Sequence, residues 1–326
     1  MQLRCARVIF VCAAILASAG EGPTTRAAEQ TQPGLHAGVQ PADQPSARFT
    51  LDTTLVLIPV TVTDSMNRFV LGLHKGDFRL SEDGSEQTIA NFSGEDAPLS
   101  VGVAFDSSGS MTDKLRTSRR AAIQFLRTMN QQDEAFLIEF GDQASLTVGF
   151  TSQLDEIQKK LASISPGGLT AMFDGTQLAL HEMRKAKNPR KAIVIISDGG
   201  DNNSRYSARE IESLVREADV QIYAMGVFQP SIFRGLSQEE VNGPRLLSQL
   251  AEQTGGRAFT ASDANDLPSV AARIAIELRN QYVLAYRSNN RNHDGKYRKV
   301  EVKITAPPGV DNLKLHWRLG YYAPSQ

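Results

Sequence analysis

Short apolar runs alternate with segments of helical spacing along residues 99–279, and this alternation constrains the fold more than any other feature of the chain. The runs at residues 99–105 and 192–196 contain too few polar residues for strands with one face in water. We therefore expect both to be central strands of a parallel sheet that is covered on both faces. The segments between the runs repeat apolar residues at helical intervals, as crossover helices do. The pattern predicts an α/β domain with a doubly wound, mainly parallel sheet over residues 98–279.

The segments on either side of this domain show the period-two pattern of β-strands. In residues 56–62 and 300–304, β-branched residues occupy every second position. Neither flanking segment, residues 48–97 or 280–326, is large enough alone to bury a good sheet face. We predict that the two segments pair into one small β-sandwich, with the α/β domain inserted between them. Two separate small β units are the alternative.

Local signals refine this division of the chain. Pro59 cannot donate a ladder hydrogen bond, so its strand is predicted to lie at a sheet edge or to carry a bulge. The pair Asp83-Gly84 suits the positive φ angles of a tight hairpin turn. Residues 228–244 are interpreted as a long loop, either folded onto the sheet edge or contacting a partner, and residues 246–253 as the helix that follows.

The first residues have the features of an export signal. Arg4 and Arg7 precede an apolar run at residues 8–17, and a small-x-small sequence ends at Ala19. The run is too short to span a membrane as a helix. We predict a cleaved signal peptide at residues 1–19, with an uncleaved anchor as the alternative. The protein is therefore expected to be exported, either to the periplasm or as a secreted protein.

Composition agrees with an exported globular protein that has no disulfides. Residues 20–47 are rich in Pro, Gly, Gln, Thr and Ala and predict a flexible linker. Both cysteines, Cys5 and Cys12, lie inside the predicted signal, so the mature protein must rely on its core. The formal charge of -1 would become about -3 when two arginines leave with the signal, and no basic run predicts nucleic-acid binding. No later run of eighteen apolar residues predicts a membrane span.

Oxygen-bearing side chains follow both predicted central strands. The sequence AFDSSGS presents Asp106, Ser108 and Ser110 after the first strand, and IISDGGDN presents Asp198 after the second. A Gly-rich segment, SPGGLTAMFDG, places Thr170 just before a predicted helix. Functional groups of an open parallel sheet gather at the carboxyl ends of its strands. If the three loops meet at that edge, five oxygen side chains converge.

A set of hydroxyls and carboxylates is suited to a hard divalent cation. Mg²⁺ is our first choice, and Mn²⁺ and Ca²⁺ are the alternatives. Because hydroxyls are neutral ligands, the bound ion would stay electrophilic and would accept a further anion. A carboxylate exposed on a partner protein would fill the open position. The metal would then serve recognition and not catalysis.

These residues resemble a known family. Asp-x-Ser-x-Ser after a buried strand, a Thr in a Gly-rich loop and Ser-Asp-Gly after a second strand resemble the metal-ion-dependent adhesion site (MIDAS) of von Willebrand factor A-type domains. The resemblance covers roughly residues 99–278, and it implies that Asp106, Ser108, Ser110, Thr170 and Asp198 are the metal ligands. It also implies a doubly wound sheet, binding of a protein ligand, as in cell adhesion, and a shift of the last helix on binding. The sequences VTVTD, GLHKGDFRLSEDG and RLGYY resemble bacterial exported proteins with this domain.

Each of these residues also has an interpretation without a metal. Asp106, Ser108 and Ser110 would stabilise a turn through backbone hydrogen bonds, Thr170 would cap the following helix, and Asp198 would be a turn residue. All five occur in three loops that a parallel sheet brings to one edge, and this combination favours the metal site.

The neighbouring residues and the other function classes leave further alternatives. Asp201 and Asn202 would either bind a second cation or, more simply, stabilise their own loop. A structural module of the envelope, in which the metal only rigidifies the loops, is the alternative to a binding module. A hydrolase is less favoured, because the five histidines are scattered and neither Gly-x-Ser-x-Gly nor a phosphate loop occurs. We therefore expect a binding protein and not an enzyme.

Overall fold

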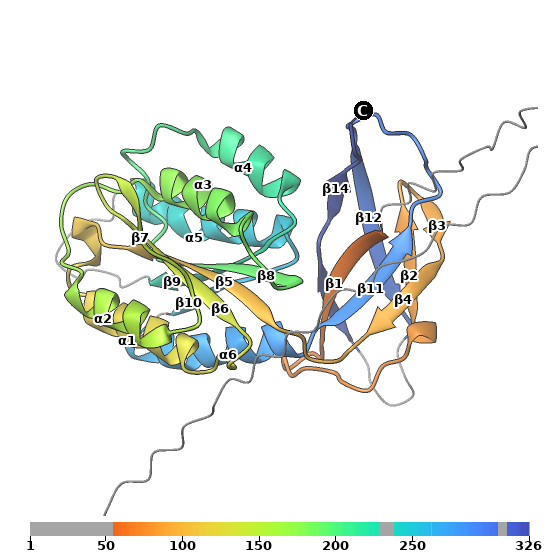
Figure 1. Ribbon diagram of the computed structural model, residues 1–326, viewed down its shortest axis with the longest axis horizontal. Coiled ribbons are helices and arrows are strands. Elements are labelled where there is room, and N and C mark those ends of the chain that lie inside the picture. The colour runs from red at the N-terminus through yellow and green to blue at the C-terminus, as the bar shows by residue number, and fades with distance from the viewer. Residues whose placement is uncertain (1–54, 228–237, 262, 306–311, 326) are drawn as a thin grey trace, which may run out of the picture. The chain divides into compact units, whose positions relative to one another are not determined.

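The computed structural model describes residues 55–227, 238–261, 263–305 and 312–325 (Figure 1). The predicted signal peptide at residues 1–19 and the predicted linker at residues 20–47 lie outside the described residues.

A six-stranded sheet forms the centre of the α/β domain (Figure 1). Its strands are β5 (Leu99–Asp106), β6 (Glu134–Phe140), β7 (Ala144–Thr151), β8 (Arg190–Ser197), β9 (Gln221–Val227) and β10 (Ala258–Ala261). The strand order is β10-β9-β8-β5-β6-β7, and only the pair β6 and β7 is antiparallel. The two apolar runs form β5 and β8, which are neighbours at the centre of the sheet. This confirms the predicted doubly wound, mainly parallel sheet.

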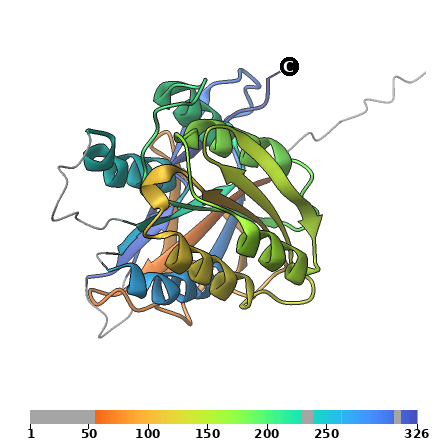
Figure 2. The same cartoon turned by 90° about the vertical axis from the view of Figure 1, so that its left-hand side faces the viewer.

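Within the described residues, three α-helices cover each face of this sheet (Figures 1 and 2). One face packs against α1 (Leu115–Leu126), α2 (Leu154–Ser163) and α6 (Leu267–Arg279), and the other against α3 (Met172–Met183), α4 (Ala208–Glu217) and α5 (Gln238–Gln253). Helix α4 begins where Ser207 Nα–H donates to the Glu210 carboxylate at 2.8 Å, as part of a capping box. None of the helices in the described part of the chain combines the length and the apolar character needed to cross a bilayer.

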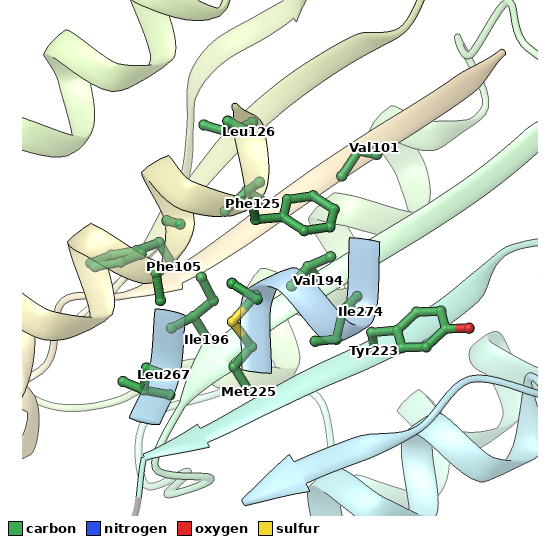
Figure 3. Close-up of a cluster of buried hydrophobic side chains, with 14 of the residues drawn as sticks. Val101, Phe105, Phe125, Leu126, Val194, Ile196, Tyr223, Met225, Leu267 and Ile274 are labelled. Carbon is green, nitrogen blue, oxygen red and sulfur yellow. The ribbon is translucent and has the colours of Figure 1, made fainter. Parts of the chain in front are cut away.

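Alternate side chains of the central strand enter different cores. Val101 and Phe105 pack with Phe125 of α1 and Ile274 of α6 (Figure 3), whereas Ala104 belongs to the cluster under the other three helices. All five of these residues are almost completely buried. A strand that is buried on both faces explains why its sequence shows no polar alternation.

The two flanking β segments form two four-stranded antiparallel sheets. The strands are β1 (Leu55–Thr63), β2 (Phe78–Glu82), β3 (Ser85–Gln87), β4 (Ile89–Ser93), β11 (Tyr282–Arg287), β12 (Tyr297–Ile304), β13 (Lys314–Trp317) and β14 (Gly320–Tyr322). The orders are β13-β1-β11-β4 and β14-β12-β2-β3, so each sheet takes strands from both segments. Ile58 and Leu284 of one sheet share a buried cluster with Leu80 and Val302 of the other. The segments thus form a β-sandwich with a common core.

Two local expectations are changed by the structure. Strand β1 lies between β11 and β13, so it is not an edge strand over its whole length. However, β13 pairs only with residues 60–63 of β1. Pro59 therefore lies in the part of β1 that pairs with β11 alone, where a missing N–H group is tolerated. The predicted loop at residues 228–244 is too long, because α5 begins at Gln238; residues 228–237 lie outside the described residues.

The turn at Asp83-Gly84 has φ angles of 47° and 83° between β2 and β3, as expected for a tight hairpin.

Candidate metal centre

Asp106 is the last residue of β5, and its carboxylate is held from two directions. Oδ1 accepts a hydrogen bond from Ser108 Nα–H at 2.9 Å, which folds the chain into the short 3-10 helix η2 (Gly109–Met111). Oδ2 accepts a hydrogen bond from the hydroxyl of Ser197, the last residue of β8, at an O–O distance of 2.5 Å. The carboxylate is completely buried, at 0% exposure. These bonds tie the end of β5 to the end of its neighbour.

The hydroxyls of Ser108 and Ser110 lie next to each other at the start of η2. Their oxygen atoms are 3.1 Å apart, and Ser108 is fully buried while Ser110 is exposed. Two neighbouring ligands of an octahedral Mg²⁺, each at about 2.0–2.1 Å from the ion, lie about 2.8–3.0 Å apart. The spacing of the two hydroxyls therefore matches one hard cation with little rearrangement.

The Gly-rich loop is joined to the loop after β5. Gly109 Nα–H donates to Gly168 O at 3.1 Å, and Gly167 Nα–H donates to Ser107 O at 2.9 Å. Gly168 has φ of +73°, and a Cβ there would lie 2.4 Å from an Asp142 carboxylate oxygen, so this position needs glycine. The Gly-rich sequence thus brings Thr170 to the edge that holds Asp106.

Thr170 is also joined to the loop after β8. Its Nα–H donates to Asn202 Oδ1 at 2.8 Å, and Asn202 Nα–H donates to Thr170 O at 3.0 Å. The side chain of Thr170 does not cap α3, whose N-cap position is Ala171. Instead, Asp201 Oδ2 accepts from Phe173 Nα–H at 2.9 Å and so caps the helix from a distance in sequence.

The contacts of Asp201 and Asn202 support the simpler of their two interpretations. Asp201 accepts a second hydrogen bond from the Ser204 hydroxyl at 2.6 Å, and Asn202 is bonded to Thr170. Burial raises the pKa of Asp201 above its ordinary value. Both side chains hold the loop after β8 against the start of α3.

Asp198 pairs with a residue that the sequence reasoning missed. Lys114 Nζ donates to Asp198 Oδ2 at 3.0 Å, and the two side chains are only 9% and 1% exposed. Lys114 immediately precedes α1, at a helix N-terminus where a cation is disfavoured by the helix dipole. No local pattern in the sequence signals this contact, because the two residues are 84 positions apart.

The charge of the cluster is negative at its centre. Burial raises the pKa of Asp106 from 3.8 to about 6, and the nearby charge of Asp198 adds to this shift. Among the ion pairs of the described residues, Lys114 contacts Asp198, and Asp106 has no cationic partner. A buried carboxylate without a cation beside it fits a site that receives a metal ion.

The donor set consists mainly of hydroxyls. Over the described ranges, no group of three or more His, Cys, Asp or Glu side chains is placed to hold a metal. The five predicted residues include only two carboxylates, so they do not form a group of that kind. The structure brings the three loops that carry Asp106, Ser108, Ser110, Thr170 and Asp198 to one edge of the sheet and joins each pair of loops by hydrogen bonds.

The fold and the site together place this protein in a class of α/β domains. In this class, a doubly wound sheet carries Asp-x-Ser-x-Ser at the carboxyl end of its central strand, within a cluster of polar loops. The family model described as von Willebrand factor type A domain matches residues 101–273, slightly more than half of the chain. The chain belongs to the von Willebrand factor type A domain family.

Individual relatives are distant. An uncharacterized protein of Borreliella burgdorferi is 24% identical over 168 residues, which cover 47% of this chain and 49% of that protein, so the match spans about half of the relative's length. The solved structure of the conserved hypothetical protein BatB from Bacteroides thetaiotaomicron is 20% identical, with 55% of this chain and 97% of that chain covered and a TM-score of 0.45. Proximal thread matrix protein 1 from the mussel byssus, with a zinc-occupied MIDAS motif, is 19% identical, with coverages of 61% and 50% and a TM-score of 0.48.

Proposed function

We propose that this protein is an exported binding module that captures an acidic group of a partner protein through a divalent cation. The observation that carries the proposal is the fully buried carboxylate of Asp106, which lies beside two hydroxyls 3.1 Å apart and has no cationic partner within the described residues. Such a group of oxygens is costly to bury unless a cation compensates the charge. Membership in the von Willebrand factor type A family supports the same role.

The proposed ligands divide into different tasks. Ser108, Ser110 and Thr170 would hold the ion with neutral oxygens, while Asp106 and Asp198 would balance its charge, directly or through water. When bound, the cation would supply an electrophilic position for an oxygen of the partner. Ser110 is the exposed member of the set, so an open position beside it would be accessible to a protein ligand. Mg²⁺ is our proposal, with Mn²⁺ and Ca²⁺ as the alternatives.

A binding role fits these contacts better than catalysis. A serine nucleophile needs a base within hydrogen-bond reach. In the described part of the chain, neither Ser108 nor Ser110 has a histidine among its hydrogen-bond partners. We therefore infer recognition and not hydrolysis.

Calorimetric titration tests the metal site. We expect wild-type protein to bind about one Mn²⁺ or Mg²⁺ per chain, and Asp106→Ala and Ser110→Ala to lose most of this binding while circular dichroism shows the fold intact. Ser145→Ala is the matched control, because Ser145 is an exposed serine on β7, outside the three loops. Equal binding by wild type, Asp106→Ala and Ser110→Ala would show that these residues do not hold the ion.

Capture experiments test the role of the ion. Partner proteins from envelope extract should bind immobilised wild-type protein in Mg²⁺ and be released by a chelator or by excess acetate. Binding that persists in chelator would favour the structural module, in which the metal only stiffens the loops. Export is tested separately by the N-terminal sequence of the mature protein, which we expect to begin at residue 20.

A further inference from the structure

We infer that Lys114 tunes the proposed metal site by competing with the cation for Asp198. This inference rests on the proposed function and deepens it. The ammonium of Lys114 weakens metal binding, and in the loaded site it leaves a net positive charge that favours an anionic partner. Lys114 thus acts through Asp198, and its charge sets how tightly the site binds the cation and an anionic partner.

Contacts fix Lys114 in this place. Its Nα–H donates to Met111 O at 2.9 Å, and its carbonyl accepts from Ser118 Nα–H at 2.9 Å, so its backbone joins η2 to the first turn of α1. From there the side chain reaches Asp198 at the end of β8, 84 residues further along the chain. Both side chains are at least nine-tenths buried, so water and salt screen this pair little.

The position is unfavourable for the helix itself. Lys114 precedes α1, whose first turn contains no acidic residue, and a cation at a helix N-terminus opposes the helix dipole. Local helix stability therefore gives no reason for a lysine here. The pairing with Asp198 across two loops gives a reason that lies in the site.

Counting charges shows what the lysine does to the loaded site. Asp106 and Asp198 contribute two negative charges, which a divalent cation neutralises. Lys114 adds one positive charge within hydrogen-bond distance of Asp198. These three side chains and the cation together then carry a net charge of about +1, which attracts a carboxylate. The ammonium of Lys114 by itself repels the cation in a region of low screening. Without Lys114 the loaded cluster would be neutral.

A purely structural role predicts the opposite result. If Lys114 served only to orient Asp198, its removal would let this carboxylate move and metal binding would weaken. Two variants separate charge from hydrogen bonding. Lys114→Met removes both the charge and the donor, and Lys114→Gln removes the charge but keeps a donor.

The first measurement is calorimetric titration with Mn²⁺ at pH 7.5. We expect the Mn²⁺ dissociation constant to fall about tenfold in both variants relative to wild type. Lys159→Met, an exposed lysine on α2, changes the net charge equally outside the three loops and should bind Mn²⁺ as wild type does. Each titration is accompanied by thermal unfolding with and without Mn²⁺. Tighter Mn²⁺ binding should then also appear as a larger rise in unfolding temperature on adding Mn²⁺ in the variants than in wild type.

The second measurement uses acetate as the anionic probe at saturating Mn²⁺. The bound Mn²⁺ relaxes the methyl protons of an acetate that coordinates it, and we expect about three- to tenfold weaker acetate binding in both Lys114 variants. Tighter Mn²⁺ binding together with weaker acetate binding supports the inference. Weaker Mn²⁺ binding in Lys114→Met, with rescue in Lys114→Gln, or unchanged Mn²⁺ and acetate binding, overturns it while the proposed metal site stands. Absence of Mn²⁺ binding by wild type overturns both.

Discussion

Replacing Asp106 with asparagine should stabilise the protein in the absence of metal. The two side chains have nearly the same size, and this one is completely buried. A shift of the carboxyl pKa from 3.8 to about 6 means that holding the charge at neutral pH costs the folded state about 3 kcal/mol. The amide cannot accept the Ser197 hydroxyl proton as well as the carboxylate does, and losing that bond costs about 1 kcal/mol. We therefore expect a net gain of about 2 kcal/mol in the free energy of unfolding.

The assay is urea denaturation at pH 7.5 in chelator, repeated with excess Mg²⁺. In chelator, Asp106→Asn should unfold at a higher urea concentration than wild type with an unchanged slope. With Mg²⁺, wild type should gain stability as the Mg²⁺ concentration exceeds its dissociation constant, and the variant should gain little. The stability advantage of the variant should therefore shrink or reverse. Asp113→Asn, at an exposed position of the same loop, is the control and should change stability by less than about 0.5 kcal/mol.

The pH dependence has a definite sign. Because the pKa of Asp106 is higher in the folded state, between pH 3.8 and about 6 the folded state binds more protons than the unfolded state. The free energy of unfolding therefore falls as pH rises through this window, and the contribution is most favourable below pH 3.8. The advantage of Asp106→Asn should appear across the window and be complete above it. A variant that is less stable than wild type in chelator at every pH would refute this reasoning.

Two further predictions concern the core and a partly buried histidine. Gly102→Ala places a Cβ 2.3 Å from the Phe136 ring and should destabilise the protein by about 1–3 kcal/mol in urea denaturation, with partial rescue by Phe136→Leu; Gly149→Ala, where a Cβ meets nothing within 4 Å, should be nearly neutral. Burial, with the charge of Arg257 nearby, lowers the pKa of His316 from 6.5 to about 4, so stability is lost as pH falls between these values. His316→Gln should lose less stability than wild type over the same pH interval. If the free energy of unfolding depends on pH identically in both proteins, His316 is not the group that causes the loss.

The fold was predictable because its main signals are local. Strands β5 and β8 are buried on both faces, and their sequences show this directly as apolar runs. The apolar residues of α6 recur with the helical period, so this helix is also visible in the sequence. The loops that meet at the carboxyl edge of a parallel sheet follow from the same topology. Metal ligation by Asp106 and its partners stays a prediction.

The pairing of Lys114 with Asp198 was not predictable from local pattern. The two residues are 84 positions apart, and their contact depends on where a flexible side chain reaches after the sheet has formed. Loop composition identified oxygen donors because their spacing is short, as in Asp106 to Ser110. A cation that reaches the cluster from outside such a motif has no periodic signature in the sequence.

The start of α5 shows the same limit and bears on the site. Gly243-Pro244 suggests a break in a chain, since glycine and proline disfavour helix interiors. The structure uses Gly243 for close approach instead: a Cβ on Gly243 would lie 2.3 Å from Asp198 O, and one on Gly199 would lie 2.5 Å from Gly243 Cα. Helix α5 therefore rests directly on the backbone of the loop that holds Asp198. The position of this carboxylate depends on the packing of a helix as well as on its own loop, because no side chain fits between them.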